Sequence, residues 1–489
     1  MNQKDENDIS QYFYRASAAD FMKIPGCPVA YWASPELINA FSRSEKLDKR
    51  AVKGLDTNGN IDRFLRRWYE ISVSQFGPFE DRSTWQPISK GGEFRRWYGN
   101  NEFCINYKGD GKALKQNKAN LRNAHFYFKE GLTWTVVSSG GFAARYMPDG
   151  FLFDQGGCGV FLGSDDSHSL FGVLGSLNSK FVKVVSKIVC PTLNFTTGDV
   201  RKFPFFGDVG LAENAERCVA LSKTDWDSAE LSWEFSGLPL LSDKNCRTVK
   251  SSYSETRERW AEMTSRMKTL QEENNRIVAD ACGLSEELES GESLAELSLT
   301  CNPQYRYGGN RSSEELETML QCDTIEELVS YAIGCMMGRY SLDKSGLILA
   351  SQGETLKDYL DQIPSPSFSP DDDGILPLTD QEWFADDATN RFREFIEVAW
   401  GKEHLQENLE FVAESLCLHA IKPPSAKSGG ESALDTIRRY LSTQFYKDHM
   451  HTYKKRPIYW LFSSGKHKAF ECLVYLHRYN EGTLARMRT

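Results

Sequence analysis

The sequence of 489 residues has room for about two to four domains and a large buried core. Its 40% hydrophobic and 26% charged residues are typical of a soluble globular protein. The net charge of −10 argues against a wholly basic nucleic-acid-binding protein.

Residues 1–50 are predicted to form a connector with two short helices. One helix is expected to start with Ser34 as N-cap and Pro35 at its first position. The polar, acidic stretch 1–10 is unlike a signal peptide, and the apolar runs are too short to span a bilayer. We therefore expect a cytoplasmic location without membrane contact.

Residues 51–206 are predicted to form a compact module of mixed α/β structure. Short segments rich in aromatic and β-branched residues alternate there with Gly, Asn and Asp. Strands are expected at 103–107, 132–137, 151–153 and 181–189, turns at 108–111 and 148–150, and a helix at 168–177. The module carries 20 Lys and Arg against 14 Asp and Glu, which fits either contact with DNA or an ordinary solvated surface.

Residues 207–298 are predicted to be a helical spacer or a helical hairpin. The segments 256–270 and 272–282 are charged and amphipathic, and Gly283 is the expected C-terminal stop. Residues 207–489 as a whole carry 31 Lys and Arg against 47 Asp and Glu, so this part of the chain is acidic.

Residues 299–489 are predicted to be mainly helical, which makes the fold class α+β. The expected helices are 312–321, 324–339, 379–400 and 433–446. Loops are expected at 364–374 and 422–430, where Pro, Ser, Gly and Asp or Lys accumulate.

No motif of a complete enzyme is found. The Gly-rich segment 156–159 is followed by a poor helix start, so we predict a turn between strands rather than a cofactor loop. The pair Asn302-Pro303 lacks the second proline of an adenine-methyltransferase catalytic turn and is expected to be a loop before a helix. The pair His449 and His451 has no accompanying Cys or carboxylate cluster, and no C-x-x-C occurs, so no metal site is expected.

Several clusters combine basic, amide and aromatic side chains in the way that DNA contact requires, because Lys and Arg bind phosphates while Arg, Asn and Gln read base edges. Lys115, Lys118 and Arg122 are expected to share one helix face. The last run, 454–456, is expected to be either a second DNA contact or a basic segment packed on its own acidic domain. The residues expected to bind DNA are Arg63, Arg66, Arg67, Lys90, Arg95, Arg96, Asn100, Asn101, Lys112, Lys115, Lys118, Arg122, Lys454, Lys455 and Arg456.

Long runs of the chain resemble PglX-type adenine-specific DNA methyltransferases of bacterial phage-exclusion (BREX) systems. The opening run 54–65 resembles the start of target-recognition domains in bacterial restriction-modification enzymes. The other matching runs are 90–101, 125–134, 142–146, 151–154, 174–180, 197–204, 305–310, 338–343, 346–350 and 453–462.

The resemblance implies that the complete enzyme transfers a methyl group from S-adenosylmethionine to the amino group of adenine in double-stranded DNA. The cofactor loop and catalytic turn of the family lie upstream of the matched region, so no S-adenosylmethionine is expected to bind this chain. Residues 51–206 then correspond to the target-recognition domain, and 1–50 to a connector from a missing catalytic domain. The chain is expected to be a fragment, or a subunit that works with a separate catalytic subunit and other phage-exclusion proteins. The alternative is a non-catalytic interaction scaffold.

Overall fold

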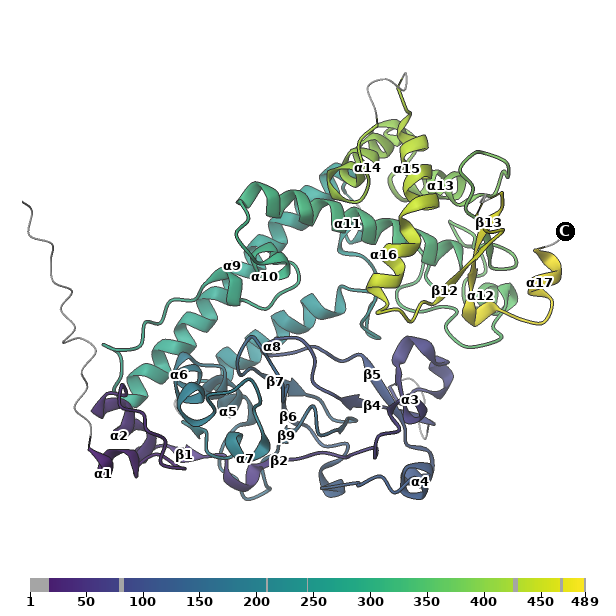
Figure 1. Ribbon diagram of the computed structural model, residues 1–489. Helices are drawn as coiled ribbons and strands as arrows, with labels where there is room; N and C mark the ends of the chain where they lie inside the picture. The colour runs from purple at the N-terminus through teal and green to yellow at the C-terminus, as the bar shows by residue number, and fades with distance from the viewer. Residues whose placement is uncertain are drawn as a thin grey trace, which may run out of the picture.

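The computed structural model describes residues 17–78, 83–207, 210–243, 245–424, 430–466 and 469–487. A part rich in short strands forms the lower half of the view in Figure 1, and a mainly helical part forms the upper half. The long helix α9 (Val249–Cys282) runs from the first part to the second. This arrangement confirms the α+β class.

The first part contains two four-stranded sheets, with strand orders β2-β9-β6-β7 and β3-β5-β4-β8, and a two-stranded pair β1-β10. Its strands are β1 (Glu45–Lys46), β2 (Ala51–Val52), β3 (Leu65–Arg67), β4 (Trp85–Ser89), β5 (Phe103–Asn106), β6 (Gly131–Trp134), β7 (Ala144–Met147), β8 (Leu152–Phe153), β9 (Gly159–Val160) and β10 (Pro204–Phe205). Its helices are α1 (Ala18–Phe21), α2 (Pro35–Arg43), α3 (Ile61–Phe64), α4 (Lys108–Gln116), α5 (Leu170–Leu177), α6 (Lys180–Val189) and α7 (Thr197–Val200).

The second part is built on helices with one three-stranded sheet of order β11-β13-β12. Its helices are α8 (Ala212–Asp227), α9, α10 (Pro303–Tyr307), α11 (Ser313–Met336), α12 (Leu356–Gln362), α13 (Ala388–Trp400), α14 (Leu405–His419), α15 (Ala433–Thr443), α16 (Phe445–Thr452) and α17 (Thr483–Arg486). Its strands are β11 (Ile375–Pro377), β12 (Tyr459–Ser463) and β13 (Glu471–Tyr475). Single turns of 3-10 helix lie at Asp48–Arg50, Trp68–Glu70, Val73–Gln75, Ala124–Phe126, Pro239–Leu241, Leu294–Glu296 and Leu476–Arg478.

Most predicted elements are confirmed. The Ser34 hydroxyl accepts a hydrogen bond from the Leu37 amide at 3.0 Å, as expected of the N-cap of α2. Strands β5 and β8 lie within the predicted segments, and β6 (Gly131–Trp134) begins one residue before the predicted segment 132–137 and ends three residues before its end. Gly283 ends α9 in the left-handed conformation, with a φ of 70°. Of the two predicted loops, 364–374 forms bends before β11, and the central residues of 422–430 lie outside the described part.

Four secondary-structure predictions are wrong. Residues 181–189 form helix α6 rather than a strand, because their buried side chains recur at helical spacing and the Ser179 hydroxyl caps the first turn. The segments 256–270 and 272–282 are one continuous helix, α9, so they do not form a hairpin. Helix α11 likewise continues through 321–324, and α13 begins only at Ala388, where the Asp387 carboxylate caps the Asn390 amide.

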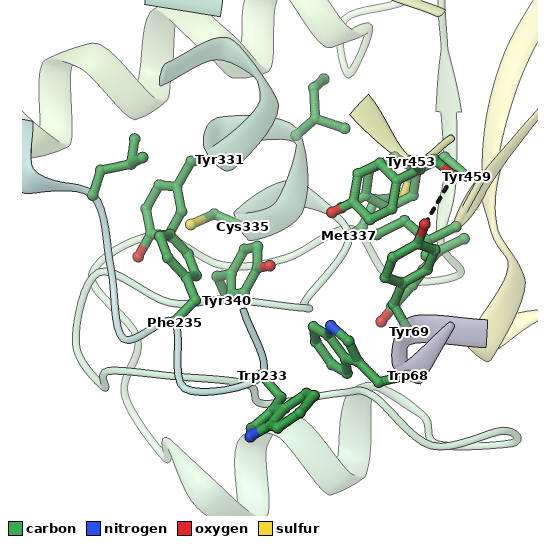
Figure 2. Close-up of a cluster of buried hydrophobic side chains, with 14 of the residues drawn as sticks. Trp68, Tyr69, Trp233, Phe235, Tyr331, Cys335, Met337, Tyr340, Tyr453 and Tyr459 are labelled. Carbon is green, nitrogen blue, oxygen red and sulfur yellow. Dashed lines mark hydrogen bonds between the residues drawn. The ribbon is translucent and has the colours of Figure 1, made fainter. Parts of the chain in front are cut away.

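The two parts share one hydrophobic core. Trp68 and Tyr69 of the first part are buried among side chains of α11 and of the segment around Tyr453 and Tyr459 in the second (Figure 2). The Tyr69 hydroxyl donates to the Tyr453 carbonyl oxygen at 2.9 Å, and the two rings meet edge to face. The Trp68 indole donates to the Leu231 carbonyl oxygen at 2.7 Å. We call this contact region the seam.

The seam contains a buried carboxylate that makes stability depend on pH. Glu230 accepts a hydrogen bond from the Tyr453 hydroxyl at 2.8 Å, and burial raises its pKa from 4.5 to about 7. The folded state therefore holds this proton more tightly than the unfolded state, and stability that is present below pH 4.5 is lost as the pH rises towards 7.

Replacing Glu230 by glutamine is expected to remove this loss. The stability of Glu230→Gln should rise relative to the native chain by roughly 1.4 kcal/mol for each pH unit between 4.5 and 7. Urea unfolding of both proteins across this window measures the difference. A difference that does not change with pH would contradict the assignment.

Candidate DNA-binding surface

Two polar loops meet on the surface of the first part. The Asn60 side-chain amide donates to the Asn117 Oδ1 at 2.8 Å, and the Asn58 side-chain amide donates to the Asn117 carbonyl oxygen at 3.2 Å. The backbones of Asp56 and Asn120 exchange hydrogen bonds of 2.9 and 2.8 Å. We call residues 54–60 and 115–120 the loop pair. It exposes side chains that can read base edges or bind phosphates, namely Asn58, Asn60, Lys115, Gln116, Lys118 and Asn120.

Helix α4 and the turn after it carry three lysines at or next to the loop pair, Lys112, Lys115 and Lys118. A turn with positive φ at Gly109, Asp110 and Gly111 precedes the regular portion of α4 and matches the predicted turn. Lys118 has a φ of 59°, so the chain leaves the helix before it and Lys115, Lys118 and Arg122 do not share a helix face as predicted. Lys112, Lys115 and Lys118 are nevertheless exposed, and no carboxylate in the described part of the chain pairs with them.

A pocket of about 250 Å³ lies beside the loop pair. Asp56, Thr57 and Ile61 line one side of it, and Lys90 and Asp154 line the other. The Lys90 ammonium pairs with the Asp154 carboxylate at 3.2 Å. The structure thus brings the predicted residue Lys90 close to the opening run 54–65.

The basic run 454–456 lies against the first part of the chain, although it is more than 350 residues away in sequence. The Lys454 ammonium is 3.5 Å from the Glu93 carboxylate, and the Arg456 guanidinium is 3.8 Å from that of Glu70. All three cations of the run are exposed. The prediction that this run is a second DNA contact stays a prediction. The two ion pairs join the run to the first part of the chain and not to the acidic remainder of its own domain.

The cluster at 63–67 is only partly available. Arg63 is exposed and its guanidinium stacks on the Phe64 ring. The Arg66 guanidinium donates to the carbonyl oxygens of Asp62 and Leu65. Arg67 pairs with Glu102 and lies 4.1 Å above the Phe103 ring, and burial lowers its pKa.

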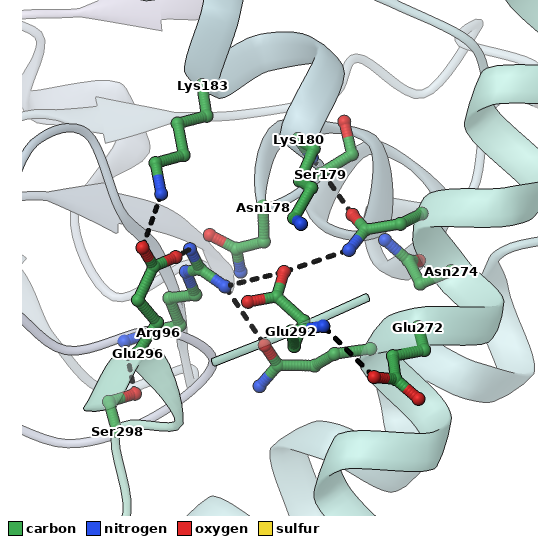
Figure 3. A network of polar contacts seen from close by, with 12 residues as sticks. Arg96, Asn178, Ser179, Lys180, Lys183, Glu272, Asn274, Glu292, Glu296 and Ser298 are labelled. Atoms are coloured by element: carbon green, nitrogen blue, oxygen red, sulfur yellow. Dashed lines mark hydrogen bonds and ion pairs between the residues drawn. The ribbon is translucent and has the colours of Figure 1, made fainter. Parts of the chain in front are cut away.

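Arg95 and Arg96 lie in the interior rather than on a DNA-facing surface. The side chain of Arg96 is only 5% exposed and binds Gln271, Glu292 and Glu296, at 2.9, 3.4 and 3.3 Å (Figure 3). Arg95 faces the buried Asp225 at 3.5 Å and stacks on Trp226. These guanidinium groups attach the segment 90–101 to α8, α9 and the 292–300 segment. Their buried position leaves them unavailable for contact with DNA. Asn101 is also buried, and the Asn100 amide donates to the Glu93 carbonyl oxygen.

The Gly-rich segment 156–159 forms a packed turn between strands and not a cofactor loop. The amides of Gly156 and Gly157 both donate to the Asp154 carboxylate, at 2.7 and 2.9 Å, and a strand rather than a helix follows. A Cβ at Gly157 would come within 2.8 Å of the Ser89 backbone, so the segment is packed rather than open. This confirms the predicted turn, and no cofactor contact is assigned to these residues.

The other candidate motifs have structural roles. Asn302 is buried and caps α10, in agreement with the predicted loop, and its amide donates to the carbonyl oxygens of Leu294 and Leu297. His449 lies on helix α16, where its ring accepts from the Ile458 and Tyr459 amides, and burial lowers its pKa to about 3. Within the described residues there is no group of His, Cys, Asp and Glu arranged for a metal and no helix suited to crossing a membrane.

Comparison with known proteins identifies relatives of the chain. Over 472 residues it is 52% identical to the adenine-specific methyltransferase BrxX of Escherichia coli O9:H4 (strain HS), an alignment that covers 96% of this chain and 38% of that protein. The chain is homologous to the PglX-type methyltransferases. A second relative, the adenine-specific methyltransferase PglX of Lacticaseibacillus casei (strain Zhang), is 34% identical over 99% of this chain and 39% of its own length. No family model matches.

The chain therefore spans less than two-fifths of the length of these two relatives. The resemblance inferred from the runs between 54 and 462 is confirmed as homology over nearly the whole chain. Sequence reasoning missed the loop-pair amides Asn58, Asn60, Gln116 and Asn120 as candidate site residues. The run 54–65 was the available signal, but the pairing of Asn60 with Asn117 depends on the fold.

Proposed function

We propose that this chain is the DNA-recognition and C-terminal part of a site-specific adenine (N6) DNA methyltransferase of a bacterial phage-defence system. The observation that carries the proposal is the loop pair, a surface of exposed amides and of lysines that pair with no carboxylate of the described residues, on a chain homologous to adenine-specific methyltransferases. The loop pair would contact a double-stranded DNA site, and the run 454–456, which lies at Glu70 and Glu93, would hold phosphates at a second place.

In this proposal, methyl transfer would be catalysed outside this chain. S-adenosylmethionine would bind a catalytic domain or subunit, which would also flip the target adenine out of the duplex. Other phage-exclusion proteins are expected partners, in the cytoplasm. Incubating the chain with unmethylated host DNA and labelled S-adenosylmethionine, with and without the product of the adjacent upstream gene, tests this division. Methyl transfer by the chain alone would contradict it.

A second candidate is an interaction scaffold. The observation in its favour is the excess of acidic residues in 207–489, which repels DNA at long range. A scaffold would show little salt-sensitive binding to DNA, so the next experiment separates the two functions.

The triple variant Lys112→Ala, Lys115→Ala, Lys118→Ala is expected to bind duplex DNA more weakly and with less salt dependence. Each lysine that no longer neutralises a phosphate lowers the slope of log affinity against log salt by about 0.9, so the three together lower it by about 2.7. Fluorescence anisotropy with a labelled duplex over a range of salt concentrations measures the slope. The triple variant Lys357→Ala, Lys402→Ala, Lys422→Ala, which removes exposed lysines of the helical part, is the matched control. Equal slopes for the two variants would contradict the DNA surface.

A further inference from the structure

A second pocket, of about 360 Å³, opens at the edge of the seam. Residues of the first part, of loops in the second part and of strand β12 line it together, among them Tyr69, Gln352, Lys455, Arg456 and Trp460. Its volume lies in the range of sites that hold one small organic ligand or one nucleotide unit. We call it the seam pocket.

Trp460 provides an exposed aromatic face at this pocket. In β12 it follows the fully buried Tyr459, and the alternation of a strand turns its side chain outwards, where it is 47% exposed. A large indole surface left in water beside a pocket is suited to stacking with a planar group. The buried Tyr69 and Ile458 fix the floor below it.

Lys455 and Arg456 provide cations at the same pocket. Both Lys454 and Lys455 have positive φ, 52° and 61°, a conformation that is unfavourable for residues other than glycine. Three backbone hydrogen bonds hold this turn, from the amides of residues 454, 455 and 456 to His451, Met450 and Tyr453, at 3.0, 2.7 and 2.8 Å. The turn therefore presents its charges from a fixed position.

Arg456 is only weakly neutralised within the chain. Its guanidinium is 3.8 Å from Glu70, whose other carboxylate oxygen accepts from the Arg67 amide at 2.7 Å. The Arg456 side chain is 57% exposed, so an anion at the pocket can reach it. The cations also disfavour S-adenosylmethionine as the occupant, because its sulfonium group is itself positive.

We propose that the seam pocket holds a single unstacked nucleotide of bound DNA, with its base against Trp460 and its phosphate at Lys455 and Arg456. A base has a planar face for the indole, and its phosphate supplies an anion for Lys455 and for the exposed Arg456 guanidinium. This inference rests on the proposed function and extends it, because it gives the C-terminal part a contact with one nucleotide rather than with the duplex backbone alone.

The test compares two duplexes that differ by one unpaired nucleotide. The full chain is expected to bind the duplex with a single-nucleotide bulge about tenfold more tightly than the fully paired duplex, as one base stacked on an aromatic ring provides. Trp460→Ala should lose this preference while it binds the paired duplex as before, and Trp460→Phe should keep most of it. Trp383→Ala removes another exposed tryptophan, 57% exposed, and should change nothing.

The outcomes separate the two proposals. If the native chain binds both duplexes equally, or if Trp460→Ala keeps the preference, the nucleotide site is wrong while the DNA surface at the loop pair stands. If Trp460→Ala weakens both duplexes to the same degree, the indole contacts paired DNA and the nucleotide site is again wrong. If neither duplex binds, both proposals fall. An unchanged melting temperature shows that Trp460→Ala is folded.

Discussion

Replacing Arg96 by alanine is expected to lower the free energy of unfolding by about 3–5 kcal/mol, the cost of breaking a buried ion pair. Arg96 and Glu292 have side chains that are 5% and 1% exposed. Without the guanidinium, the Glu292 carboxylate stays buried and keeps the Asn275 amide, at 2.8 Å, as its hydrogen-bond donor. Glu296 still has Lys183 as a partner, so Glu292 carries most of the penalty.

Chemical denaturation of the two proteins measures this effect. Adding Glu292→Gln to Arg96→Ala should recover part of the lost stability, because it removes the unpaired charge. Arg217→Ala is the matched control: its ion pair with Glu213 is 52% and 74% exposed, and its loss should cost less than about 1 kcal/mol. A loss of DNA affinity in Arg96→Ala at full stability would contradict the interior role of Arg96 and restore it as a DNA contact.

The burial of Arg95 and Arg96 could not be predicted from the sequence. A run of Arg, Trp, Asn and Gly is compatible with both a DNA surface and a packed interior, and the choice depends on partners that lie far along the chain. Gln271, Glu292 and Glu296 are about 200 residues away in sequence, and nothing near Arg96 indicates them. Long-range ion pairs of this kind can be assigned only once the fold is known.

Local signals were more dependable. The Ser34 cap, the Gly283 stop and the turn at 108–111 each follow from the backbone preferences of one or two residues, and the structure confirms all three. The segment 181–189 was mistaken for a strand because an apolar, β-branched run suits both elements. Its buried side chains recur at helical spacing and the Ser179 hydroxyl caps the first turn, so the segment forms a helix. The predicted α+β class is nevertheless confirmed, because it depends on many elements together and not on any single one.

The position of Lys454 beside Glu93 had no local signal at all. It follows from the seam, where the aromatic residues of 68–69 enter the core of the helical part. The predicted boundary between 206 and 207 therefore separates segments of the chain that share a core. Because the seam packs residues 68–69 into the helical part, the run 454–456 is held against Glu70 and Glu93 of the first part.

Replacing Trp68 by alanine is expected to destabilise the protein by about 3–5 kcal/mol, as is typical of a large buried aromatic residue. The indole is fully buried, its N–H bonds Leu231, and the Arg339 guanidinium lies 5.5 Å from its ring. Its removal leaves a cavity at the seam and an unsatisfied carbonyl oxygen. Trp68→Phe should lose less, and Trp383→Ala, at an exposed site, should stay within about 0.5 kcal/mol of the native chain.

The manner of unfolding tests the shared core more directly than the size of the loss. If the two parts unfold as one unit, Trp68→Ala should increase amide hydrogen exchange in β3 to β5 and in α11 by the same free energy. Faster exchange in the strands alone would show that the first part unfolds by itself, and the run 454–456 would then lose its contacts with Glu70 and Glu93. An equal change in the free energy of exchange in both parts would mean that the seam holds the proposed DNA surface and the seam pocket in one rigid arrangement.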